Sequence, residues 1–123
     1  MEKENIKQIQ NGDYFIFQGR DIVKVRNRIG ENLFSIQTKY KTFLYANIEE
    51  LQPIVIDVVI LERAGFEREI NTDLYHYNGI SLYFRDIAKI ITSKDAKLLM
   101  NIFYLHVLQN ALRLFGEEVE LKL

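Results

Sequence analysis

The stretch Tyr104 to Gly116, YLHVLQNALRLFG, decides how the rest of the chain is expected to fold. On a helix with about 100° per residue, its polar side chains fall on one line at positions i, i+3, i+4 and i+7. These side chains are His106, Gln109, Asn110 and Arg113. The apolar remainder covers far more than the roughly 100° stripe of an ordinary surface helix. We therefore expect a central helix that is covered on more than one side and ends at Gly116, where a left-handed cap favours glycine.

The composition is that of one domain, or of two small lobes that share a core. Apolar residues form 48% of the 123-residue chain, which is enough for a hydrophobic centre. No apolar run of about 18 residues predicts a membrane span. The opening MEKENIKQIQ lacks the apolar region of a signal peptide, and the absence of cysteine excludes disulfides and thiolate zinc sites. We expect a cytoplasmic protein of the producing or infected cell, with no membrane partner.

Short strands rich in aromatic and β-branched residues fill the first part of the chain. They are expected at 14–17, 22–25, 33–37 and 42–45, separated by turns that contain Gly19, Gly30 and the pair Lys39 and Lys41. Such strands predict a small, strongly curved sheet or half barrel, and whether the barrel closes stays open. Pro53 then marks a linker or edge strand, because it removes a backbone donor. We expect a β lobe over 1–52 and an α+β lobe over 53–123, within one structural unit.

The second lobe begins with a short helix over 58–64, with Asp57 as its N-cap and Gly65 as its end. Asn78-Gly79, between two apolar runs, predicts a type I′ hairpin. A third strand is expected over 87–92. Residues 94–101 read as either strand or helix, and periodicity favours a strand followed by a helix from about Asn101. The alternation after Gly116 allows a last edge strand.

The predicted fold class is therefore α+β. It consists of a small curved N-terminal β-sheet or half barrel, a short connecting helix, and an antiparallel β-meander packed on one long C-terminal helix.

Several segments resemble a family of small uncharacterised proteins encoded by phages and prophages of gut anaerobes. The segments that carry the likeness are Gly12-Asp13-Tyr14 with Gly19 and Ile22 to Val25, Asn47 to Ile54, Leu61 to Glu67, Leu105 to Asn110, and Phe115 to Glu118. The chain is one residue shorter than that family between Asn110 and Gly116. The resemblance implies a viral or mobile-element origin and an α+β fold, and it implies no activity.

Two groups of residues are candidate binding sites. The polar row His106, Gln109, Asn110 and Arg113 offers donors and acceptors for a phosphate, a nucleobase or a peptide carbonyl. The alternatives are a solvated helix face or a hydrogen-bonding row that seats the β lobe. The second group accompanies the aromatic residues of the β lobe, a combination that small barrels use to bind nucleic acid or anions. Its members are Arg20, Lys24, Arg26, Arg28, Lys39 and Lys41.

Catalysis has little support in the sequence. Neither a GxSxG elbow nor a glycine-rich phosphate loop is present, and His76 with His106 do not make a typical metal site. No catalytic residue, metal or cofactor is predicted.

Three classes of function remain. The first is a non-enzymatic phage or mobile-element interaction protein that binds a host protein or a small nucleotide-like signalling ligand, as a counter-defence factor. The second is a nucleic-acid-binding accessory protein that uses the basic aromatic β lobe, which the net charge of −1 does not favour. The third is a small enzyme of unknown type. The wide apolar arc of the helix also predicts a homodimer.

Overall fold

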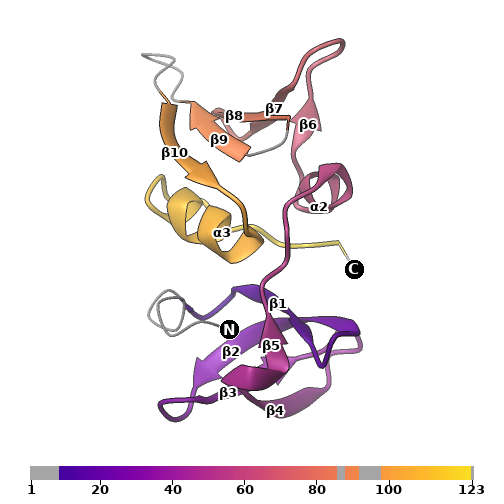
Figure 1. Cartoon of the computed structure of the whole chain (residues 1–123), viewed down its shortest axis with the longest axis vertical. Coiled ribbons are helices and arrows are strands. Elements are labelled where there is room, and N and C mark those ends of the chain that lie inside the picture. Colours follow the sequence, from indigo (N-terminus) through magenta and orange to yellow (C-terminus); the bar gives the residue numbers. More distant parts are fainter. Residues whose placement is uncertain (1–8, 86–87, 92–97, 123) are drawn as a thin grey trace.

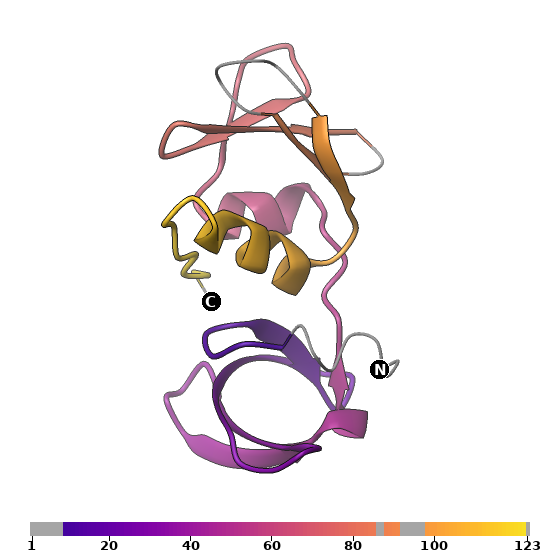
Figure 2. The same ribbon diagram turned by 90° about the vertical axis from the view of Figure 1, so that its left-hand side faces the viewer.

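In the part of the chain that the structure describes, two antiparallel sheets lie on either side of two α-helices (Figures 1 and 2). The computed structural model describes residues 9–85, 88–91 and 98–122. The predicted α+β class, with a curled N-terminal sheet and a C-terminal helix, is confirmed.

The first sheet has the strand order β4-β3-β2-β1-β5 and curls into a half barrel (Figure 2). Its strands are β1 (Tyr14–Phe17), β2 (Asp21–Arg28), β3 (Leu33–Gln37), β4 (Phe43–Asn47) and β5 (Leu51–Gln52). A 3₁₀ turn, η1 (Ile48–Glu50), joins β4 to β5. A shift of register between Val25 and Asn27 of β2 marks an irregularity of the kind that increases local twist. The two edges of this sheet are therefore β4 and β5.

Two of the predicted turns have positive φ at both central residues. Gln18 and Gly19 have φ values of 53° and 71°, and Asn78 and Gly79 have values of 46° and 81°. Positive φ at both central residues is the requirement of a type I′ turn, which asparagine and glycine meet most easily. The predicted Asn78-Gly79 hairpin is confirmed, since Tyr77 pairs with Ile80 on either side of it.

The linker after Pro53 leads into the helix α2 (Val58–Arg63). The Asp57 carboxylate accepts a hydrogen bond from the Ile60 amide at 2.8 Å and so caps the helix as predicted. Gly65, with φ of 95°, follows the helix, and Phe66 is buried beyond it. A single β-bridge joins Val55 of the linker to Tyr104 at the start of the last helix.

The second sheet has the order β10-β9-β8-β7-β6. Its strands are β6 (Glu67–Arg68), β7 (Leu74–Tyr77), β8 (Ile80–Phe84), β9 (Ala88–Ile91) and β10 (Leu98–Ile102). The helix α3 (Leu105–Arg113) follows β10, which agrees with the preference for a strand before the helix. Of the stretch 94–101, which reads as either strand or helix, residues 98–101 lie in β10 and 94–97 lie outside the described residues. The helix begins at Leu105 and not near Asn101, because β10 extends to Ile102.

The buried side chains form two clusters on either side of the junction between the sheets. One cluster fills the first sheet and draws its members from Ile9 to Leu51. The other packs α2 and α3 against the second sheet and takes Tyr14 from β1. Tyr14 is thus a residue of the first sheet whose side chain packs in the cluster of the second sheet. The division of the chain at residue 52 into two lobes stays a prediction.

The last helix differs from its sequence-based description in two ways. It ends at Arg113, so that Leu114 and Phe115, expected in the apolar arc, are 87% and 45% exposed. Its polar row, by contrast, includes two fully buried side chains, His106 and Gln109. The wheel alone does not show that a second lobe lies against the polar side.

The expected edge strand after Gly116 is wrong for the part of this segment that the structure describes. Val119 and Leu121 are buried and alternate with exposed residues, as predicted. Their backbone pairs with no strand there. It is held instead by Tyr14, whose hydroxyl accepts from the Leu121 amide at 3.2 Å, and by the Arg63 carbonyl, which accepts from the Lys122 amide at 2.9 Å.

Candidate functional site

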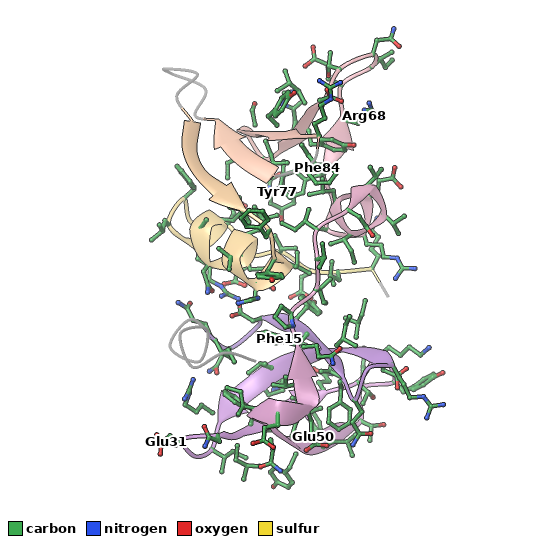
Figure 3. All side chains as sticks on the ribbon, in the orientation of Figure 1. Phe15, Glu31, Glu50, Arg68, Tyr77 and Phe84 are labelled. Atoms are coloured by element: carbon green, nitrogen blue, oxygen red, sulfur yellow. The ribbon has the colours of Figure 1, made fainter. Side chains whose placement is uncertain are left out.

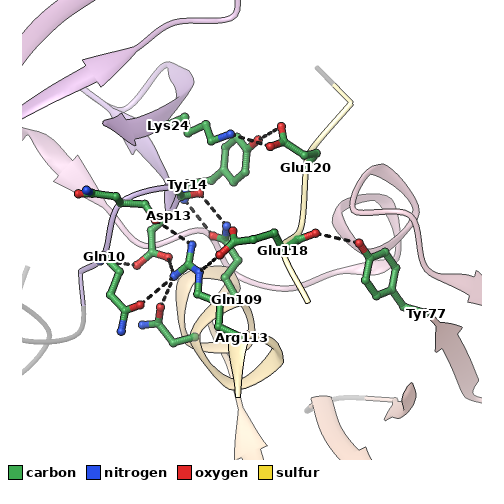
Figure 4. A network of polar contacts seen from close by, with 12 residues as sticks. Gln10, Asp13, Tyr14, Lys24, Tyr77, Gln109, Arg113, Glu118 and Glu120 are labelled. Atoms are coloured by element: carbon green, nitrogen blue, oxygen red, sulfur yellow. Dashed lines mark hydrogen bonds and ion pairs between the residues drawn. The ribbon is translucent and has the colours of Figure 1, made fainter. Parts of the chain in front are cut away.

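An ion-pair network ties α3 to the start of β1 (Figure 4). Arg113 Nη1 donates to the Asp13 carboxylate at 2.6 Å, and Arg113 Nε donates to the Glu118 carboxylate at 2.6 Å. A third guanidinium nitrogen, Nη2, donates to the Asn11 carbonyl at 3.1 Å. Because Asp13 is fully buried, the Arg113 guanidinium is the charge that compensates it.

Gln109 completes the junction by hydrogen bonding to the backbone of β1. Its Oε1 accepts from the Tyr14 amide at 2.9 Å, and its Nε2 donates to the Gly12 carbonyl at 2.9 Å. A Cβ on Gly12 would lie 2.9 Å from Arg113 Nη2, and its φ is 94°. The positive φ favours glycine at this position, whereas the contact is with the end of the flexible Arg113 side chain.

The buried charge and the buried imidazole at the junction have shifted pKa values in opposite directions. Burial raises the pKa of Asp13 to about 6, against the lowering effects of the Gln10 amide and Arg113. Burial lowers the pKa of His106 to about 4. The His106 imidazole contacts two rings, with its centroid 4.9 Å from that of Phe15 (labelled in Figure 3) and 6.1 Å from that of Tyr104. Among the described residues, neither of its nitrogens has a hydrogen-bond partner.

These contacts show what the predicted polar row of α3 does in the fold. His106, Gln109 and Arg113 face the β lobe, and Asn110 lies beside Arg113, to which its side-chain oxygen is hydrogen bonded. This arrangement corresponds to one of the alternatives named from the sequence, a hydrogen-bonding row that holds the β lobe against the helix. A ligand- or partner-binding role for these four residues stays a prediction.

A pocket of about 280 Å³ opens at the edge of this junction. It is lined by the β lobe on one side and by the C-terminal segment on the other, through Tyr14, Lys24, Gln37, Thr38, Lys39, Lys41, Glu120 and Leu121. Lys24 Nζ forms an ion pair with Glu120 at 2.9 Å. Although partial burial alone would lower the pKa of Lys24, the hydrogen bond to Glu120 and nearby negative charge raise it, so Lys24 carries a charge at neutral pH.

A second pocket, of about 260 Å³, lies between the β1–β2 turn and α2. Its lining residues are Arg20, Asp21, Ile22, Lys39 and Arg63. Lys39 is shared with the first pocket and links the two. We call the two together the junction pockets.

The basic residues predicted as anion contacts thus divide into two sets. Arg20, Lys24, Lys39 and Lys41 line the junction pockets. Arg26 and Arg28 lie further along β2, where their guanidinium carbons are 5.3 Å from the Phe43 ring centroid and 4.9 Å from that of Phe34. The anion-binding role of all six stays a prediction.

Sequence reasoning missed Arg63, which comes from α2 and reaches the second pocket. Its only signal in the sequence is its position in the last turn of that helix. The approach of α2 to the β1–β2 turn is a long-range property, and local pattern does not reveal it.

In the described part of the chain, no group of three or more histidine, aspartate or glutamate side chains is arranged to hold a metal ion. The two histidines are in different environments. His76 contacts Ser81 at 3.0 Å and Glu69 at 3.1 Å on the second sheet, whereas His106 is buried at the junction. No helix among the described residues is long and apolar enough to cross a membrane.

Comparisons of the chain with protein-family models, with curated proteins and with solved structures give no match.

Proposed function

We propose that the protein is a non-enzymatic binding protein that holds the phosphate groups of an anionic ligand in the junction pockets. The observation that carries the proposal is the position of Lys39, which lines both pockets where the two lobes meet. Phosphate oxygens accept charge-assisted hydrogen bonds from lysine and arginine, the basic residue types that line these pockets.

Local charge supports an anionic ligand. The junction pockets are lined by five basic side chains (Arg20, Lys24, Lys39, Lys41 and Arg63) and two acidic ones (Asp21 and Glu120), a net charge of +3. The whole chain carries −1. A concave surface with a net positive charge concentrates anions.

The ion pairs at the site also favour this reading. Glu120 is paired with Lys24, which leaves Lys39 and Lys41 as the uncompensated cations of the first pocket. No carboxylate of the described residues lies within 4 Å of the charged nitrogens of Lys39, Lys41, Arg20 or Arg63. A surface charge with no counterion in the protein gains more from a bound phosphate than one that must first break an ion pair.

The two pockets, of about 280 and 260 Å³, together fall within the size range of small-molecule sites. Phosphate groups suit this charge and size, whether they belong to a small nucleotide-like signalling ligand or to a longer phosphorylated ligand. With a phage or prophage origin, we further propose that sequestering such a ligand acts against a host defence. A homodimer remains part of this proposal, with Val58, Val59 and Phe103 among the exposed apolar residues available to it.

The test is calorimetric titration of the protein with inorganic pyrophosphate and with ATP. Lys39→Glu is the informative variant, because it removes the cation that both pockets share and places a negative charge there. We expect its Kd for both probes to rise more than tenfold, on the scale of about 1.5–3 kcal/mol for a hydrogen bond to a charged group. Arg85→Glu is the matched control, since Arg85 is exposed and lines neither pocket.

Equal weakening by Lys39→Glu and Arg85→Glu would show that only net charge matters, and would overturn the site. Absence of heat with either probe at millimolar concentration would overturn phosphate binding itself.

A further inference from the structure

We infer that the ligand of the junction pockets is single-stranded nucleic acid, whose bases stack on the outer face of β4. This inference rests on the proposed function, because the pockets would hold the phosphate adjacent to the stacked bases. It assigns a role to the exposed aromatic residues of the half barrel, which the pockets alone do not use.

The register of β3 and β4 places two aromatic rings on the outer face. Leu44 pairs with Ile36 and Ala46 pairs with Phe34, and three of these four side chains are fully buried, so this is the inner face. Residues directly opposite in a sheet share a face, and successive residues alternate. Phe43 and Tyr45 therefore lie on the outer face.

The exposure of these rings is unusual for their size. Phe43 is 60% exposed and Tyr45 is 70% exposed, and Tyr40 in the preceding turn is 78% exposed. As alternate residues of one strand, Phe43 and Tyr45 are spaced by about 6.6 Å. Consecutive bases of an extended single strand can therefore each meet one ring, in the way that aromatic residues of small barrels bind unpaired bases.

The outer face is continuous with the first pocket. Phe43 pairs with Gln37, and Gln37 pairs with Lys24, so these three side chains form one row across β4, β3 and β2. Gln37 and Lys24 also line the pocket of about 280 Å³. A single-stranded nucleic acid that stacks its bases on β4 thus brings its sugar–phosphate backbone toward Lys39 and Lys41. These two lysines lie in the turn that leads into β4.

A cation accompanies the first ring. The Arg26 guanidinium carbon lies 5.3 Å from the Phe43 ring centroid, within the distance of a cation–π contact. An arginine held against an aromatic ring presents donors to a phosphate while the ring presents its remaining face to a base. The outer face of β4 therefore combines the two features of a single-strand platform, exposed rings and adjacent positive charge.

The experiment measures fluorescence anisotropy of a labelled oligothymidylate of about ten nucleotides, within the range of site sizes of small barrels. We compare the wild type with Phe43→Ala, Tyr45→Ala, Lys39→Glu and the control Ile70→Ala. Ile70 is an 85% exposed apolar residue of the second lobe and lines neither junction pocket. Since each stacked base contributes about 1–3 kcal/mol, we expect each aromatic variant to raise the Kd for the oligonucleotide by about fivefold or more, and Ile70→Ala to leave it unchanged. Neither aromatic variant should alter the Kd for pyrophosphate.

The outcomes separate the two proposals. Pyrophosphate binding that Lys39→Glu weakens, together with oligonucleotide binding no tighter than that of pyrophosphate, would overturn the inference and leave the proposed function standing. Oligonucleotide binding that Phe43→Ala and Tyr45→Ala leave unchanged would also overturn it, and would point to β4 as a surface for a protein partner. Oligonucleotide binding that depends on both rings but not on Lys39 would instead overturn the proposed function.

Discussion

Two buried groups at the lobe junction are expected to give opposing contributions to the pH dependence of stability. The folded pKa of His106 is about 4, below its ordinary value of 6.5. Its contribution to the free energy of unfolding is therefore present above pH 6.5 and is lost as the pH falls through 4. The folded pKa of Asp13 is about 6, above its ordinary value of 3.8. Its contribution is fully present below pH 3.8 and is lost as the pH rises through 6.

The magnitudes follow from about 1.36 kcal/mol for each pKa unit. Between pH 4.5 and 7.5, the His106 contribution should increase the free energy of unfolding by about 2.5 kcal/mol. Over the same range, the Asp13 contribution should decrease it by about 2 kcal/mol. In the wild type the two changes nearly cancel.

The assay is urea unfolding of the wild type and of three variants at the two pH values. For His106→Leu we expect the free energy of unfolding to fall by about 2 kcal/mol from pH 4.5 to 7.5, because only the Asp13 contribution remains. The wild-type value should be nearly unchanged over this range. For Asp13→Asn we expect a rise of about 2.5 kcal/mol over the same range. The double variant should return to the wild-type profile. His76→Gln, at the exposed histidine of the second sheet, is the control.

Parallel pH profiles for the wild type and His106→Leu would refute the reasoning, because they would show that His106 has a similar pKa in the folded and unfolded chains.

Three further predictions concern stability and are checked by thermal or urea unfolding. Gly79→Val should lower the free energy of unfolding by about 1 kcal/mol or more. The cause is backbone strain alone, since φ is 81° and no heavy atom lies within 4 Å of the added Cβ. An unchanged Tm would show that the turn is assigned wrongly. Gln109→Leu should cost about 1–3 kcal/mol, because it leaves the buried Tyr14 amide without its acceptor, and a neutral result would mean that the lobe junction is open in solution. Leu114→Ala should change the free energy of unfolding by less than about 0.5 kcal/mol, whereas Leu112→Ala should lower it by about 2–5 kcal/mol. Comparable losses in the two variants would indicate that Leu114 is buried in a longer helix, as the sequence predicts.

Local pattern was sufficient for most of the elements. The Asn78-Gly79 turn, the Asp57 cap and the positions of the first strands depend on residues close together in the chain, and the sequence predicts all three. These features follow from backbone sterics and side-chain period, which a sequence displays directly.

The role of the polar row on α3 could not be derived in the same way. A helical wheel separates polar from apolar positions, but it does not say whether water or a second lobe faces the polar side. Gln109 hydrogen bonds to residues 95 and 97 positions away, and Arg113 pairs with Asp13 100 positions away. The exposed positions of Leu114 and Phe115 follow from the helix ending at Arg113.

The sequence predicts the candidate site only in part, because its residues come from distant parts of the chain. The sequence points to Lys39 and Lys41 because they lie among aromatic residues, and to Lys24 because it lies on the same lobe. Their convergence at the junction pockets depends on how the C-terminal segment and α2 pack against the β lobe.

The central claim is that the junction pockets bind phosphate groups, and amide NMR shifts on titration with pyrophosphate test it most directly. We predict that the largest changes fall on Gln37 to Lys41 and on Arg20 to Lys24, with saturation at a single Kd, and that Lys39→Glu removes them. Shifts that concentrate on the second sheet, around Leu74 to Phe84, or that persist in Lys39→Glu, would contradict the claim.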